Sequence, residues 1–156
     1  MSSTMTESPD LEARTRAVRA LEGEFAELIN QYRQVLLANA ERLSPGLLPG
    51  AYKVFTVIVR KESVTTSALA ETLMMDKGQL SRTVRELEQL GLVHRTPDPE
   101  DGRSSLLSPT AEGLQRLADA RRPYEDSLVT TLADWPVDEI DHLARLLNAL
   151  SGGTAP

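Results

Sequence analysis

The feature that most constrains the fold is an apolar stripe that begins at Leu11, in a segment that no proline interrupts before Pro45. From Val18 to Val35 the apolar positions are spaced alternately three and four residues apart, which places them on one side of a helix. The stripe comprises Leu11, Val18, Leu21, Phe25, Leu28, Tyr32 and Val35. A lone helix cannot bury such a face. The stripe therefore packs either within the same chain or against a second molecule.

The composition is that of a globular chain with one compact body. It has 156 residues, of which 40% are hydrophobic and 26% charged. No apolar run approaches the roughly 20 residues that cross a membrane, and residues 1–10 lack the features of a secretory signal. We therefore expect a cytoplasmic location. The formal charge of −6 argues against indiscriminate binding to nucleic acid, but it leaves room for a local basic face.

The middle of the chain predicts two short helices joined by a tight turn. A connector precedes a helix from Pro49 to about Lys61, which buries Val54, Phe55 and Ile58. Thr65 or Thr66 then caps a helix that ends at Leu73. Asp76 caps the next one, which runs to about Leu90 and stops at Gly91. Two helices in this arrangement predict a helix-turn-helix.

The second of these helices has two chemically different sides. Leu80, Thr83, Val84, Leu87 and Leu90 share one side, whereas Gly78, Ser81, Arg82, Arg85 and Gln89 share the other. Arginine pairs with guanine or phosphate, and glutamine pairs with adenine. The polar side predicts a DNA-reading face, although an ordinary solvated face would look the same in isolation.

The residues after Gly91 favour the DNA-reading interpretation. Residues 92–96 and 104–108 predict two strands joined by a loop, so the helix-turn-helix continues into a β-hairpin, as in a winged helix. The loop carries Arg103 beside Asp101. We expect the carboxylate to hold the guanidinium extended toward a phosphate or the minor groove.

The C-terminal part predicts two further helices. Thr110 caps the first, which Pro123 should kink or split, and Pro136 opens the second. Trp135, the only tryptophan, lies between them. The last helix carries a second apolar stripe, formed by Ile140, Leu143, Leu147 and Leu150.

The sequence argues against an enzyme and against a metal or cofactor site. There are two histidines, far apart, and no cysteine, so neither a histidine–cysteine metal cluster nor a thiol nucleophile can form. No serine lies in a G-x-S-x-G elbow, and no glycine-rich phosphate loop is present.

The order of these motifs resembles the MarR (multiple antibiotic resistance regulator) family of winged-helix transcription factors over about residues 11–150. The strongest part of the resemblance is the wing, Asp98-Pro99-Glu100-Asp101-Gly102-Arg103, after a Gly91-Leu92-Val93 strand start. The resemblance implies a mainly α fold with a small β-hairpin wing, in which N- and C-terminal helices from two copies interleave in a homodimer. It also implies a transcriptional repressor that releases DNA when a small aromatic or phenolic ligand binds.

The resemblance divides the chain into five parts. Residues 1–10 form an N-terminal tail, 11–45 a dimerisation helix, 46–108 the DNA-binding lobe, 109–150 the C-terminal dimerisation helices and 151–156 a tail. The expected dimer contacts are Leu11, Val18, Leu21, Ile140, Leu143, Leu147 and Leu150. The expected ligand-binding residues are Tyr32, Tyr52, Phe55 and Arg60, with the alternative that these are only core and surface residues.

The predicted partner is double-stranded DNA with a pseudo-palindromic operator, read by two recognition helices in successive major grooves. We expect base contacts from Gln79, Ser81, Arg82 and Arg85. Phosphate contacts are expected from Lys77, Arg95 and the wing Arg103, which Asp101 supports. The alternative, which the acidic total charge leaves open, is a winged helix that binds protein without specific DNA binding.

Overall fold

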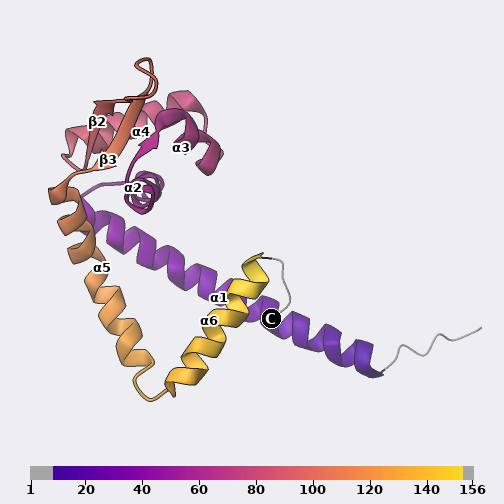
Figure 1. The fold of residues 1–156 in the computed structure, drawn as a ribbon. Helices are drawn as coiled ribbons and strands as arrows, with labels where there is room; N and C mark the ends of the chain where they lie inside the picture. Colours follow the sequence, from indigo (N-terminus) through magenta and orange to yellow (C-terminus); the bar gives the residue numbers. More distant parts are fainter. Residues whose placement is uncertain (1–8, 153–156) are drawn as a thin grey trace, which may run out of the picture.

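The computed structural model describes residues 9–152 and contains six helices and three short strands (Figure 1). Their bounds are α1 Pro9–Leu43, α2 Pro49–Lys61, β1 Val64–Thr65, α3 Thr66–Leu73, α4 Lys77–Gln89, β2 Val93–Pro97, β3 Ser105–Pro109, α5 Ala111–Thr131 and α6 Val137–Gly152. The predicted mainly α winged helix-turn-helix is confirmed. Of the predicted tails, residues 1–8 and 153–156 lie outside the described residues.

The molecule has a small lobe at one end and a frame of long helices (Figure 1). The lobe holds α2, α3, α4 and the sheet, and the wing hairpin projects from it on the side away from α6. Helices α1 and α5 leave the lobe together and diverge, and α6 turns back across α1. The three long helices thus outline a triangle with the lobe at one corner.

Helix α1 is long and mostly solvent-exposed. Its 35 residues extend over about 50 Å, but only Asn39, Ala40 and Leu43 in its last two turns are buried. It begins at Pro9, two residues before the predicted start at Leu11. A proline fits the first turn of a helix, where its missing N–H needs no partner.

The core lies in the lobe and is built around α2. Val54, Phe55 and Ile58 are fully buried, as predicted. They pack in one cluster with apolar residues from every other element of the lobe and from the near ends of α1 and α5. The Tyr52 hydroxyl lies within this cluster and accepts a 3.4 Å hydrogen bond from Asn39 Nδ2.

Three predicted helix caps set the boundaries of α3, α4 and α5. The Thr65 hydroxyl accepts a hydrogen bond from the Ala68 N–H (3.2 Å). The Asp76 carboxylate accepts one from Gln79 N–H (3.0 Å), and the Thr110 hydroxyl accepts one from Gly113 N–H (2.9 Å). Each cap satisfies a backbone donor that the helix itself leaves without a partner.

The sheet has one strand more than the predicted hairpin. Its order is β1-β3-β2, with Val64 of β1 opposite Leu107 of β3. The two wing strands pair antiparallel from Val93↔Pro109 to Pro97↔Ser105, one residue later than predicted. A two-residue strand carries no periodic signal, so β1 could not be read from the sequence.

The C-terminal helices differ from the prediction at two places. Helix α5 runs unbroken through Pro123, so the predicted split does not occur. A proline removes one backbone hydrogen bond, and the segments 111–122 and 124–131 each form two or more helical turns around it. Helix α6 ends at Gly152 rather than at Leu150, because its last turn continues into the predicted tail.

The start of α5 docks on the junction between α4 and β2. The Thr110 hydroxyl donates to the Gly91 carbonyl (2.6 Å), and the Thr110 N–H donates to the Leu92 carbonyl (3.0 Å). A β-carbon at Gly113 would lie 2.5 Å from that Leu92 oxygen and 3.0 Å from Phe55 Cζ. Only glycine therefore allows α5 to approach the lobe this closely.

We predict that Gly113→Ala lowers the free energy of unfolding by about 1–3 kcal/mol, because the added methyl group meets backbone that cannot move aside cheaply. Urea unfolding followed by circular dichroism measures the change. Gly102→Ala is the matched control, since a β-carbon there has nothing within 4 Å and should change stability by less than about 0.5 kcal/mol. A Gly113→Ala variant as stable as the parent would contradict the close approach.

Candidate nucleic-acid interface

Helix α4 presents a basic stripe to solvent because its other side is fixed in the core. Leu80, Val84 and Leu87 are fully buried, and the Asp76 cap fixes where the helix begins. On the opposite side, Arg82 and Arg85 are both exposed. Of the other residues predicted to contact DNA from α4, Lys77 and Gln79 are exposed and Ser81 is half-buried.

Gly78 at the start of α4 has a local structural reason. A β-carbon there would lie 3.0 Å from the Asp76 carboxylate oxygen that caps the helix. The glycine therefore keeps room for the cap.

The two arginines of the stripe are free to meet an anion. Over residues 9–152, the ion pairs within 4.0 Å are Arg95–Glu88, Arg116–Glu112 and Arg122–Asp119. Arg82 and Arg85 are in none of them. Because no carboxylate there has to be displaced first, both guanidinium groups can pair with phosphate or a base edge at little electrostatic cost.

Arg95, a predicted phosphate contact, forms an ion pair with Glu88. Its Nε and Nη2 donate to the two carboxylate oxygens of Glu88 at 3.1 and 3.2 Å, which joins the wing to α4. The hydrogen bond with Glu88 raises the pKa of Arg95, against the opposing effect of partial burial. The guanidinium thus holds the wing against α4, and a phosphate that met Arg95 would have to compete with the Glu88 carboxylate.

The wing loop is held by its own backbone and carboxylates. The Asp98 N–H donates to the Ser104 carbonyl, and the Ser104 N–H donates to the Asp101 carbonyl at 2.8 Å. The Asp101 carboxylate accepts a 3.1 Å hydrogen bond from the backbone N–H of Arg103. The prediction that Asp101 holds the Arg103 guanidinium is therefore corrected. Asp101 shapes the turn, and the exposed Arg103 side chain projects from it.

Sequence reasoning missed Met74, which lies in the turn between α3 and α4. Its backbone is left-handed (φ 50°, ψ 41°), and its side chain is 94% exposed. Both features are unfavourable for a large apolar residue. The turn directly precedes the Asp76 cap, so Met74 extends the surface that surrounds the start of α4. The two adjacent methionines gave no signal of this exposure in the sequence.

The predicted dimer residues remain largely uncovered in the single chain. Leu11, Val18, Leu21, Leu143, Leu147 and Leu150 are each about half exposed, and Ile140 is half-buried. An apolar hollow between α1 and α6 is lined by Leu21 and Phe25 from α1 and by Leu143, Leu146, Leu147, Ala149 and Leu150 from α6. The two stripes thus approach each other within one chain and still leave apolar surface open.

The four predicted ligand-binding residues do not come together. Tyr52 and Phe55 are buried in the lobe core, and Arg60 is exposed near the end of α2. Helix α2 buries most of its circumference, which the sequence pattern alone did not show. Tyr32 instead lines a cavity of about 500 Å³ on α1, to which α5 contributes Tyr124.

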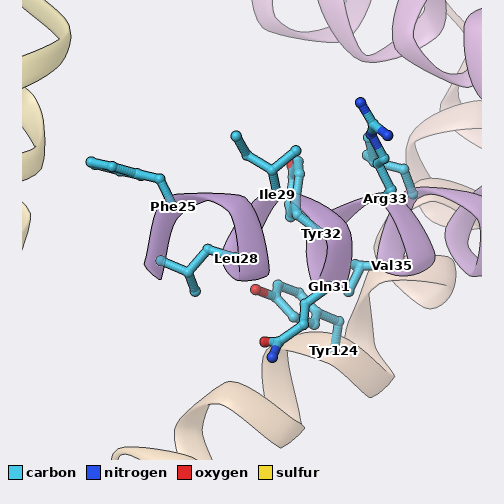
Figure 2. Close-up of a pocket in the computed structure, with 9 residues that line it drawn as sticks. Phe25, Leu28, Ile29, Gln31, Tyr32, Arg33, Val35 and Tyr124 are labelled. Atoms are coloured by element: carbon cyan, nitrogen blue, oxygen red, sulfur yellow. The ribbon is translucent and has the colours of Figure 1, made fainter. Parts of the chain in front are cut away.

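Figure 2 shows this cavity, where Tyr124 reaches from α5 toward α1. The rings of Tyr32 and Tyr124 meet edge to face, with centroids 6.5 Å apart. Arg33 points away from Tyr124 (Figure 2). The surroundings are apolar side chains with phenolic edges, which suit a small aromatic molecule.

Two other kinds of site are absent from the described part of the chain. No helix in residues 9–152 combines the length and apolar content that a membrane crossing requires. Within the same residues, no group of three or more histidine and acidic side chains is placed to hold a metal ion.

Comparison with known proteins agrees with the lobe's architecture. A family model described as MarR family matches residues 46–104. The transcriptional regulator HosA from Escherichia coli O111:H- is 33% identical over 102 residues, which cover 64% of this chain and 75% of that protein. The HTH-type transcriptional regulator YxaD from Bacillus subtilis (strain 168) is 28% identical over 134 residues, covering 86% of this chain and 92% of that one.

Solved structures share the fold. A mutant MarR from E. coli, complexed with operator DNA, is 26% identical with a TM-score of 0.57, and the match covers 82% of this chain and 91% of that chain. A MepR mutant from an S. aureus clinical isolate is 16% identical with a TM-score of 0.71, over 85% and 96% of the two chains, and shows the fold alone. The chain therefore belongs to the MarR family of winged-helix, DNA-binding transcriptional regulators.

Proposed function

We propose that the protein is a homodimeric repressor that reads a pseudo-palindromic operator and is released from it by a small aromatic ligand. In this proposal α1, α5 and α6 form the dimerisation region, and residues 46–108 form the DNA-binding lobe. The observation that carries the proposal is the pair Arg82 and Arg85, which lie outside the ion pairs of the described residues on a helix whose opposite side is locked in the core.

The proposed contacts divide by chemistry. Gln79, Ser81, Arg82 and Arg85 read base edges in the major groove, since their amide, hydroxyl and guanidinium groups match base donors and acceptors. Lys77 and the wing Arg103 contact phosphate and fix the register. The structure with operator DNA among the similar proteins supports this arrangement.

The charge balance favours sequence-specific over indiscriminate binding. Between Lys77 and Arg103 there are five basic residues (77, 82, 85, 95 and 103) and five acidic ones (86, 88, 98, 100 and 101). Arg95 is paired with Glu88, so four basic residues of this segment (77, 82, 85 and 103) remain outside that ion pair. They act as separate exposed charges and do not create a general positive field. The affinity must then come from fitted contacts.

The homodimer is supported by the uncovered apolar stripes. Helices α1 and α6 expose leucine and valine along faces that their own chain does not cover. A second copy would bury both stripes with the same residues on each side, as a two-fold interface requires. The repressor function rests on the likeness to the Multiple Antibiotic Resistance Repressor, MarR, which is 27% identical with a TM-score of 0.61.

The DNA contacts predict two different losses. Arg103→Ala should weaken operator binding and reduce the slope of log affinity against log salt by about one, because one phosphate contact is lost. Arg82→Ala should instead cost about 1–3 kcal/mol at the selected sequence and relax preference at one or two base pairs. Fluorescence anisotropy on duplexes that the parent protein selects from a random pool measures both.

Arg122→Ala is the control for both arginine variants, because Arg122 lies on α5 in a surface ion pair with Asp119 and should leave binding unchanged. An unaltered salt slope in Arg103→Ala would count against its phosphate contact. Equal weakening on all sequences by Arg82→Ala would reduce that residue to a phosphate clamp.

The dimer predicts that charge in the stripes separates the subunits. Val18→Glu together with Leu147→Glu should give a folded monomer at micromolar concentration, because the interface would bury carboxylates without partners. Sedimentation velocity measures the mass, and circular dichroism reports the fold. Leu48→Glu is the control, since Leu48 is 69% exposed on the connector before α2, away from both stripes. A double variant that stays dimeric contradicts this interface.

Ligand release predicts a coupled optical and binding signal. A hydroxybenzoic acid should quench the fluorescence of Trp135, the only tryptophan, and release DNA over the same concentration range. Tyr32→Ala should weaken both effects, because it removes a wall of the cavity between α1 and α5. Tyr52→Phe, which keeps the buried ring, should change neither. Quenching without release of DNA would mean that the ligand does not regulate binding.

A further inference from the structure

Three helices meet at the guanidinium of Arg116 on α5. Its Nε and Nη2 donate to the Leu43 carbonyl at 3.1 and 2.6 Å, and its Nη1 donates to the Leu90 carbonyl at 3.1 Å. Leu43 is the last residue of α1, and Leu90 is the C-terminal cap residue of α4. These carbonyls are 73 and 26 positions away in the sequence.

The contact is chemically specific to arginine. Carbonyl groups at a helix C-terminus lack intrahelical partners and carry partial negative charge, so a cation stabilises them. Here two such ends face one planar group, which reaches both with separate N–H donors. The Glu112 carboxylate lies 3.6 Å from Nη1, one helical turn earlier on α5, and favours the same position of the side chain.

This contact lies at the corner where the lobe joins the long helices, so it can affect how the lobe is oriented. All buried residues of α1 lie in its last turns, so the lobe joins the long-helix frame only at this corner (Figure 1). The covalent links there are the connector between α1 and α2 and the entry into α5 at Thr110. Arg116 adds a direct bridge between the end of α1 and the end of the recognition helix α4.

We propose that Arg116 is a positioning residue that sets the angle of α4 relative to α1 and thereby fixes the half-site spacing that the dimer accepts. The proposal rests on the homodimer proposed above. In such a dimer α1 belongs to the shared interface and α4 enters the major groove, so rotation at this corner changes the separation of the two recognition helices. Arg116 itself contacts no base or phosphate.

The test measures spacing preference rather than affinity alone. We compare the parent, Arg116→Lys and Arg116→Met on the selected operator and on the same operator with one base pair inserted or deleted between the half-sites. The ratio of affinities for correct and altered spacing should fall about fivefold in both variants, the factor that corresponds to losing one hydrogen bond of ordinary strength. Binding to a duplex with a single half-site should stay unchanged.

A second measurement follows the lobe directly. The chain has no cysteine, so Glu71→Cys on the exposed side of α3 gives one spin label per subunit and one label pair per dimer. Pulsed electron paramagnetic resonance should give a narrow distance distribution in the parent background and a broader one with Arg116→Lys. Arg122→Lys is the matched control on the same helix, where the ion pair with Asp119 bridges no other element.

Three results would count against the proposals, and they are distinguishable. Folded dimers of both Arg116 variants with unchanged spacing ratios and label distances would overturn the proposal. Loss of folding by both variants would also overturn it, in favour of a purely structural role. If the parent protein were monomeric or indifferent to half-site spacing, the proposed homodimeric function would fail instead, which distinguishes the two failures.

Discussion

The structure depends on where its apolar side chains are buried, and over residues 9–152 nearly all of the buried ones gather in a single core. That core surrounds α2 in the lobe and takes in the near ends of α1 and α5, but it does not extend along the long helices. The leucines and valines of α1 and α6 therefore remain as uncovered apolar stripes. A stripe of this length cannot contribute to stability while it faces water. The proposed homodimer would cover these stripes, because the chain itself supplies too few apolar partners to bury them.

The lobe has to bind DNA, a polyanion, although the chain as a whole is acidic. It relies on the positions of a few basic side chains and not on an excess of positive charge. Glu88 is paired with Arg95, and in the wing loop the carboxylates of Asp98 and Asp101 accept hydrogen bonds from backbone N–H groups. Arg82, Arg85 and Arg103 lie in the same lobe outside the ion pairs found among residues 9–152. Binding that depends on a few placed cations favours specificity over general attraction to DNA.

Local signals in the sequence were sufficient for the elements of the lobe, but not for its long-range contacts. Capping residues have a defined side-chain geometry, and periodicity marks a buried face, so the starts of α3, α4 and α5 and the core side of α4 could be predicted. The family resemblance added the expectation of an interleaved dimer, which no local pattern contains. Whether Arg95 meets phosphate or Glu88 depends instead on which elements pack together. Arg116 illustrates the limit most clearly, because its two carbonyl partners belong to backbone and leave no trace in the identity of Leu43 or Leu90.

Helix α5 links the separate parts of the molecule. Its first residues bind the Gly91–Leu92 junction, its second turn carries Arg116 between the ends of α1 and α4, and farther along Tyr124 closes the cavity with Tyr32. A molecule that enters this cavity would contact both α1 and α5, the two helices whose relative position Arg116 also constrains. Energetic coupling between two sites requires a shared element with more than one arrangement. In this fold α5 carries both Tyr124 of the cavity and Arg116. A ligand in the cavity could therefore affect DNA binding through α5, without any change in the core of the lobe.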